Sequence, residues 1–171
     1  LNPEKPILTL LPGSRQQEID RHWHIFLKTV ELVKKLQPHI QIILAKSNNV
    51  RIRNIPNYYC IESNPKKAIL VASVALVASG TATLECGIEK VPIVVCYKLS
   101  FLSWIIAKYI IRIKYISIVN LIAEKKIVPE YIQSEMKPIK MRDKIIELLD
   151  PTSKTRLLML ENLEKMKIKL G

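Results

Sequence analysis

Short apolar runs that alternate with longer helical stretches constrain this 171-residue chain more than any other feature. Residues 7–11, 41–45, 74–78 and 93–96 are apolar almost throughout, and residues 58–61 form a weaker run of the same kind. Strands with no polar face are typical of parallel sheets that helices cover on both sides, so we expect an open sheet of about five strands. The predicted fold class is therefore α/β and Rossmann-like.

Helical periodicity fills the gaps between these runs. After Gly13 and Ser14, a long apolar stripe recurs at steps of three and four, at Ile19, Trp23, Phe26, Val30 and Val33. Ser14 with Gln17 three residues later is a candidate capping box. Shorter helices are expected over 66–71 and 82–88, and two amphipathic helices over 139–149 and 153–169, separated by Asp150-Pro151.

These elements suggest a division into two parts. Residues 1–137 would form the sheet domain, including a basic apolar helical segment at about 99–118. Residues 138–171 would form helices that pack on that domain or on a missing partner half. The chain starts at Leu1 and enters its first strand through Asn2-Pro3-Glu4-Lys5-Pro6, which indicates a segment of a longer chain.

Charge and cysteine content narrow the function classes. The chain carries 27 basic and 15 acidic residues, a net charge of +12, which favours a phosphate, a nucleic acid or an acidic membrane as partner without choosing among them. The hydrophobic fraction of 49% excludes a mainly disordered chain. The cysteines and histidines lack metal-ligand spacing, so we expect no metal and reduced thiols in the cytoplasm; the histidines are interpreted as surface or packing residues.

Two strand-to-helix turns carry the chemistry. The first is Leu11-Pro12-Gly13-Ser14-Arg15, where glycine permits a tight turn, the helix start offers free N–H groups and Arg15 offers a fork of donors suited to a diphosphate. The second is Ser79-Gly80-Thr81-Ala82-Thr83-Leu84-Glu85, where Glu85 can accept hydrogen bonds from ribose hydroxyls one turn into the helix. Either turn alone could be only a helix cap. Neither has dinucleotide or Walker A spacing, so together they favour a sugar nucleotide.

Four blocks of sequence in order resemble the lipid-A-disaccharide synthase family. They are the first turn with Glu18-Ile19, the segment Val77 to Glu85, Pro92-Ile93-Val94-Val95 with Tyr97-Lys98, and Ile118 to Ala123 followed by Val128-Pro129-Glu130 and Gln133. The resemblance implies the C-terminal, donor-binding half of a GT-B glycosyltransferase. That family joins UDP-2,3-diacylglucosamine to 2,3-diacylglucosamine 1-phosphate with inversion, forms a β-1,6 disaccharide, and uses no metal or cofactor.

The resemblance also implies residue roles. Arg15 would stabilise the diphosphate leaving group, Glu85 would bind the ribose, and Asn120 would lie at the cleft near the diphosphate. The remaining substrate-binding residues would be Gly13, Ser14, Ser79, Gly80, Thr81 and Ala82. The family's catalytic aspartate belongs to the N-terminal half, so no catalytic base is assigned in this chain, and Glu62 and Glu130 are not assigned that role. Val119 and Glu124 depart from a usual proline and glycine.

The segment at 99–118 combines apolar and aromatic residues with Lys98, Lys108, Arg112 and Lys114, so it is too interrupted to span a bilayer. It fits either a core helix or an interfacial helix that places the protein peripherally on the inner face of the inner membrane of a Gram-negative-type bacterium. The sequence leaves open whether the protein forms a homo-oligomer. The alternatives are another GT-B enzyme that uses UDP-GlcNAc (a peptidoglycan transferase or a 2-epimerase) and a basic nucleic-acid-binding module, which lacks a recognised motif.

Overall fold

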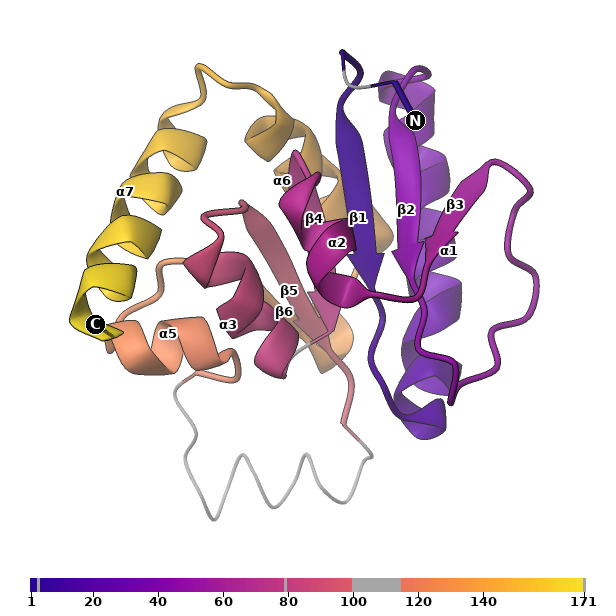
Figure 1. Ribbon diagram of the computed structural model, residues 1–171, viewed down its shortest axis with the longest axis horizontal. Coiled ribbons are helices and arrows are strands. Elements are labelled where there is room, and N and C mark those ends of the chain that lie inside the picture. The colour runs from indigo at the N-terminus through magenta and orange to yellow at the C-terminus, as the bar shows by residue number, and fades with distance from the viewer. Residues whose placement is uncertain (3, 79, 100–114, 171) are drawn as a thin grey trace.

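The computed structural model describes residues 1–2, 4–78, 80–99 and 115–170. Its centre is a parallel sheet with the strand order β3-β2-β1-β4-β5-β6 (Figure 1). The strands are β1 (Ile7–Leu11), β2 (Gln41–Ala45), β3 (Tyr59–Glu62), β4 (Val74–Ala78), β5 (Ile93–Tyr97) and β6 (Glu130–Ile132). This confirms the open α/β sheet, with the doubly wound order of Rossmann-like folds.

The apolar runs form the inner strands of the sheet, where both faces of each strand are buried. Every residue of β1 and β4 is buried. Leu10 of β1 pairs with Leu44 of β2 on one side and with Leu76 of β4 on the other, and all three are fully buried. Because helices cover both faces, no position along these strands faces water, and the period-2 alternation of half-exposed strands is absent from the sequence there.

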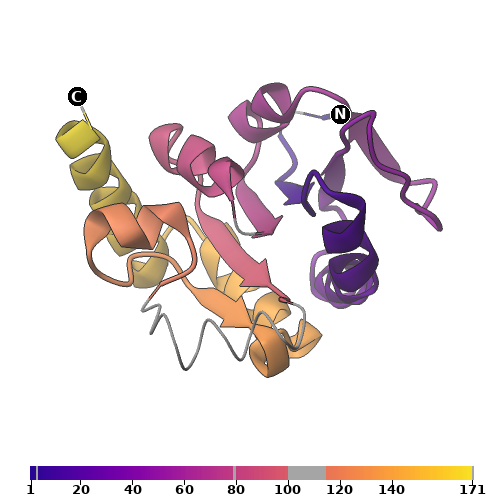
Figure 2. The same ribbon diagram turned by 90° about the horizontal axis from the view of Figure 1, so that it is seen from below.

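Two helical layers cover the sheet (Figure 2). On one face lie α1 (Gln16–Leu36) and α6 (Pro138–Leu149), which pack on each other. On the other lie α2 (Pro65–Leu70) and α3 (Thr81–Ile88), and α3 in turn contacts α5 (Ile118–Ala123) and α7 (Lys154–Leu170). The apolar stripe of α1 is buried as predicted, with Phe26, Val30 and Val33 fully inaccessible.

The C-terminal helices are built into this domain. Met141, Ile145 and Leu148 of α6 are fully buried, and Met159, Leu163 and Met166 of α7 are buried as well. Arg156 of α7 donates hydrogen bonds to the carbonyl oxygens of Ser73, just before β4, and of Leu148. Residues 138–170 therefore complete the core around α1 and α3.

Two sequence expectations need correction. The sheet has a sixth strand, β6, which pairs with β5 in the register Val95 to Glu130 and is followed by a short 3-10 turn, η2 (Gln133–Glu135). The cap of α1 is Arg15, with extended backbone angles, and not Ser14. The carboxylate that folds back is that of Glu18, so the pairing of Ser14 with Gln17 is wrong by one residue.

Candidate functional site

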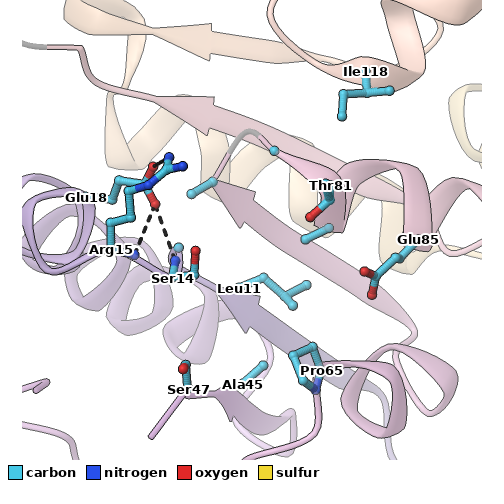
Figure 3. A pocket seen from close by; sticks show the side chains of 14 residues that line it. Leu11, Ser14, Arg15, Glu18, Ala45, Ser47, Pro65, Thr81, Glu85 and Ile118 are labelled. Carbon is cyan, nitrogen blue, oxygen red and sulfur yellow. Dashed lines mark hydrogen bonds and ion pairs between the residues drawn. The ribbon is translucent and has the colours of Figure 1, made fainter. Parts of the chain in front are cut away.

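The strand order reverses between β1 and β4, and a cavity of about 390 Å³ opens there beside the carboxyl ends of the strands. In parallel α/β sheets this reversal is where ligands bind. The cavity wall includes most of the predicted site residues, namely Gly13, Ser14, Arg15, Gly80, Thr81, Ala82 and Glu85. Figure 3 shows Ser14 and Arg15 on one side of the cavity and Thr81 and Glu85 on the other. The two turns, 66 residues apart in the sequence from Ser14 to Gly80, thus share one site.

The first turn is shaped around the carboxylate of Glu18. Gly13 has φ +116°, and a Cβ there would lie 2.6 Å from Oε2 of Glu18. The same oxygen accepts hydrogen bonds from the backbone N–H groups of Ser14 and Arg15, at 3.3 and 3.4 Å. These two N–H groups, which precede α1, are therefore already paired with a carboxylate of this chain.

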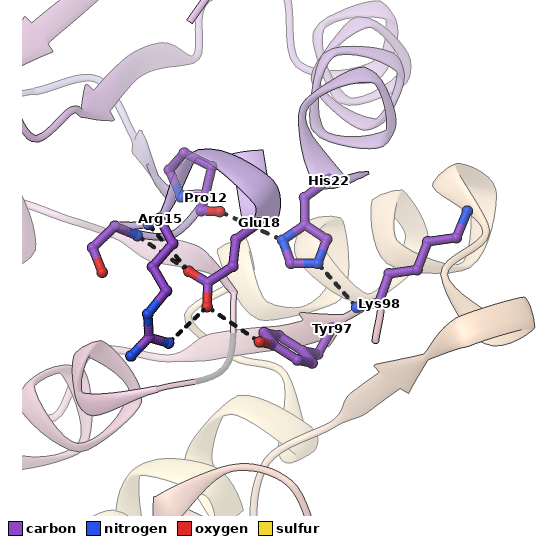
Figure 4. A network of polar contacts seen from close by, with 7 residues as sticks. Pro12, Arg15, Glu18, His22, Tyr97 and Lys98 are labelled. Atoms are coloured by element: carbon purple, nitrogen blue, oxygen red, sulfur yellow. Dashed lines mark hydrogen bonds and ion pairs between the residues drawn. The ribbon is translucent and has the colours of Figure 1, made fainter. Parts of the chain in front are cut away.

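Arg15 is the exposed cation of this turn. Its side chain is 80% exposed, and Nη1 lies 3.3 Å from Oε1 of Glu18 (Figure 4). Only the guanidinium side of this pair is open to solvent, because the Glu18 side chain is 10% exposed and also accepts hydrogen bonds from the backbone N–H groups of Ser14 and Arg15. The guanidinium can therefore turn from Glu18 to an anionic ligand in the cavity while the carboxylate keeps its backbone partners.

Glu18 also links the first turn to the end of β5. The hydroxyl of Tyr97 donates to Oε1 of Glu18 at 3.1 Å, and burial raises the pKa of that phenol. Beside it, the buried ring of His22 packs against Tyr97 with centroids 5.2 Å apart. Nε2 of His22 accepts the backbone N–H of Lys98 at 2.9 Å, while Nδ1 faces the carbonyl of Pro12 (Figure 4).

Burial lowers the pKa of His22, so the ring is neutral at physiological pH and carries its proton on the nitrogen that faces Pro12. His22 is indeed a packing residue, yet its role in joining the first turn to β5 was missed. Periodicity could not reveal that role, because His22 and Lys98 are 76 residues apart.

The second turn presents the start of α3 to the cavity. Gly80 has φ +146° and ψ −164°, a conformation that essentially only glycine adopts, and a Cβ there would meet no atom within 4 Å. No side chain in the described part of the protein caps the first turn of α3. The partial positive charge of this helix start therefore faces the cavity, and Glu85 follows one turn later on the same wall.

Two predicted site residues are not among those that the structure places on the wall. Ser79 lies outside the described residues. Asn120 is fully buried in α5 and is not part of the cavity surface, although its neighbour Ile118 is. Nearby, Glu124 ends α5 with φ 54°, a left-handed conformation that explains why glycine is usual there.

The described residues contain no group of three or more acidic, His or Cys side chains arranged to hold a metal ion. Cys86 and Cys96 are buried, and burial raises the pKa of Cys86 to about 12, while Cys60 is exposed on the edge strand β3. Among the helices that the structure describes, none is long and apolar enough to cross a bilayer. Of the apolar segment at 99–118, residues 100–114 lie outside the described part.

Comparisons with solved structures place the fold among GT-B glycosyltransferases. The chain superposes on the spinosyn rhamnosyltransferase SpnG with a TM-score of 0.60 and 13% identity, covering 95% of this chain and 42% of that one. The spinosyn forosaminyltransferase SpnP gives a TM-score of 0.56 at 13% identity, covering 97% and 39%. At this level of identity the likeness shows the fold alone.

Sequence comparisons define the family. The chain is 32% identical over 155 residues to the lipid-A-disaccharide synthase of Coxiella burnetii (strain Dugway 5J108-111), covering 88% of this chain and 41% of the relative. It is 32% identical over 146 residues to lipid-A-disaccharide synthase 1 of Legionella pneumophila (strain Paris), covering 81% and 38%. The chain thus spans about two fifths of the length of these relatives. A family model described as lipid-A-disaccharide synthetase matches residues 1–169, and the chain belongs to that family.

Proposed function

We propose that this chain is the donor-binding half of a lipid-A-disaccharide synthase and that it binds a UDP-sugar in the cavity between β1 and β4. The observation that carries the proposal is the convergence of Arg15, the start of α3 and Glu85 on one cavity at the point where the strand order reverses. A cation and a helix start suit a diphosphate, and a carboxylate suits the paired hydroxyls of a ribose.

The chemistry follows from the charge that develops during transfer. When the bond between the sugar and the diphosphate breaks, negative charge accumulates on the departing UDP. Arg15, whose side chain is 80% exposed, can turn to that charge, and the start of α3 offers oriented N–H groups from the opposite side of the cavity. Leaving-group stabilisation of this kind requires no general base from this chain.

The remaining parts of the reaction are assigned to the rest of the enzyme. The donor would be UDP-2,3-diacylglucosamine, and the acceptor, an acylated glucosamine 1-phosphate, would be held by a second half that also supplies the catalytic base. Transfer with inversion would then form the β-1,6 disaccharide, and this chain alone would bind donor without turnover. With substrates that carry acyl chains, the enzyme would work peripherally at the cytoplasmic face of the inner membrane, as a monomer or a homo-oligomer.

Isothermal titration calorimetry with UDP, uridine and pyrophosphate tests the proposal. Arg15→Ala should weaken UDP binding by about tenfold or more, because one charge-assisted hydrogen bond is lost, and leave uridine unaffected. Glu85→Gln should weaken UDP and uridine but not pyrophosphate. Arg142→Ala is the matched control, because that arginine pairs with Asp143 on α6 and does not line the cavity.

Two results would contradict the proposal. One is a wild-type chain that shows no saturable UDP binding. The other is an oligonucleotide that binds more tightly than UDP and loses affinity on Arg15→Ala, which would favour a nucleic-acid-binding module instead.

A further inference from the structure

The side-chain amide of Asn120 has no hydrogen-bonding capacity left for a ligand. Its Oδ1 accepts the backbone N–H groups of Ile127 and Val128, at 2.7 and 2.9 Å. Its Nδ2 donates to the carbonyl of Val128 and to Oε1 of Glu130, both at 2.9 Å. An asparagine side chain offers two donors and two acceptor positions, so all four are used here.

Glu130 is the second centre of the same cluster. Besides Asn120, its carboxylate accepts the backbone N–H groups of Ile116 and Ser117, at 3.0 and 2.8 Å, and the hydroxyl of Ser117 at 2.7 Å. The Ser117 oxygen in turn caps α5 by accepting the N–H of Asn120 at 3.2 Å. Ser117, Asn120 and Glu130 thus tie the start of α5 to the first residue of β6; we call these three residues the α5 clamp.

The α5 clamp lies directly behind the cavity wall. Ile118, between Ser117 and Asn120 in the sequence, lines the cavity, whereas Ser117, Asn120 and Glu130 do not. Val119 holds the other side of α5, since it is fully buried and would lie 3.1 Å from a Cβ at Gly87 of α3. The position of Ile118 on the wall therefore depends on a clamp with no contact with the cavity.

We propose that Asn120 and Glu130 are positioning residues, which fix Ile118 on the wall of the donor site, and that Asn120 does not bind the diphosphate. To reach a phosphate, the Asn120 amide would have to abandon buried backbone groups that have no other partner among the described residues. Leaving buried donors and acceptors unpaired is costly, whereas Arg15 can reach an anion without such a loss. The test by UDP binding described below rests on the proposed function, whereas the test by hydrogen exchange does not.

A double-mutant cycle on UDP affinity separates positioning from contact. The variants are Asn120→Ser, Glu130→Gln and their combination, each mild enough to spare the apolar core, with Asn162→Ser on α7 as a matched asparagine control. Because both residues act through one clamp, each single variant should weaken UDP binding to a similar extent, about three- to tenfold, and the double variant no further. Asn162→Ser should leave the affinity unchanged.

Ile118→Ala tests whether the α5 clamp affects UDP affinity through Ile118. A merely structural role of the clamp would not depend on this side chain. Once the wall side chain is shortened, Asn120→Ser should produce little further loss of UDP affinity. The proposal is overturned if Asn120→Ser weakens UDP more than about tenfold while Glu130→Gln has no effect, which is the pattern of a direct phosphate contact. It is also overturned if both variants lose stability and keep full UDP affinity.

Hydrogen exchange tests the clamp without any ligand. Protection of the amides of Ser117, Asn120, Ile127 and Val128 should fall by about tenfold or more in each single variant and no further in the double variant. If the wild-type chain does not bind UDP, the proposed function fails. The exchange data then decide the remaining claim, and unchanged protection in Glu130→Gln would reject the clamp.

Discussion

Replacing Gly13 with alanine should be costly for two separable reasons. The first is backbone strain, because φ is +116° at this position, and such conformations cost about 1–3 kcal/mol for a residue with a Cβ. The second is a collision, because the new Cβ would lie 2.6 Å from Oε2 of Glu18. The carboxylate would have to leave two hydrogen bonds of 3.3 and 3.4 Å, each contributing about 0.5–1.5 kcal/mol. The combined loss of unfolding free energy is about 2–6 kcal/mol.

Urea denaturation followed by circular dichroism measures this loss, and Glu18→Ala separates its two parts. In the Glu18→Ala background the collision is absent, so Gly13→Ala should cost only the strain, which is less by about 1–3 kcal/mol than its cost in the wild-type chain. Gly80→Ala is the matched control, because φ is +146° and no atom lies within 4 Å of its Cβ, so its cost should not depend on Glu18. An equal cost of Gly13→Ala in both backgrounds would refute the reasoning.

Two further predictions concern stability. Burial lowers the pKa of His22 below 6.5, so an unfolded chain takes up this proton first, and His22 favours folding above about pH 6.5 and progressively less as the pH falls below it. The unfolding free energy should therefore drop between about pH 7 and 5, and drop less in His22→Gln; equal drops in urea titrations would contradict this. Glu124→Gly should stabilise the chain by about 0.5–1 kcal/mol, since φ is 54° at this exposed helix end, whereas Glu124→Ala should give no gain.

The sequence predicted the inner sheet well because burial on both faces makes each inner strand apolar at almost every position. Leu8, Leu10 and Leu76 belong to such apolar runs, and each run is legible without its neighbours. β6 has no such run, because its three residues are half-buried and it starts with a glutamate. Its pairing with β5 depends on Glu130 being held by the start of α5, which is a tertiary contact.

The part of the candidate site that lies in the two strand-to-helix turns could be predicted from the local sequence. Gly13, Arg15, Gly80 and Glu85 reach the cavity because the topology brings the ends of β1 and β4 together. The cap of α1 was misplaced because serine is the better intrinsic capping residue, while the carboxylate that folds back belongs to Glu18 of α1, which Tyr97 of β5 contacts. The place of Asn120 depends on its hydrogen bonds to Ile127, Val128 and Glu130, which no local sequence pattern predicts.

The central place of β1 has a consequence for biosynthesis. β1 is made before β2 and β4, pairs with β2 on one side, and receives its second neighbour only when β4 has been made, since Leu8 pairs with both Ile42 and Val74. Roughly 30 residues separate the two events, or a few seconds of translation at about 5–20 residues per second. For that interval an apolar strand exposes an open edge to solvent, the kind of template on which neighbouring nascent chains can aggregate. The risk of losing newly made protein is therefore concentrated in the time before β4 leaves the ribosome.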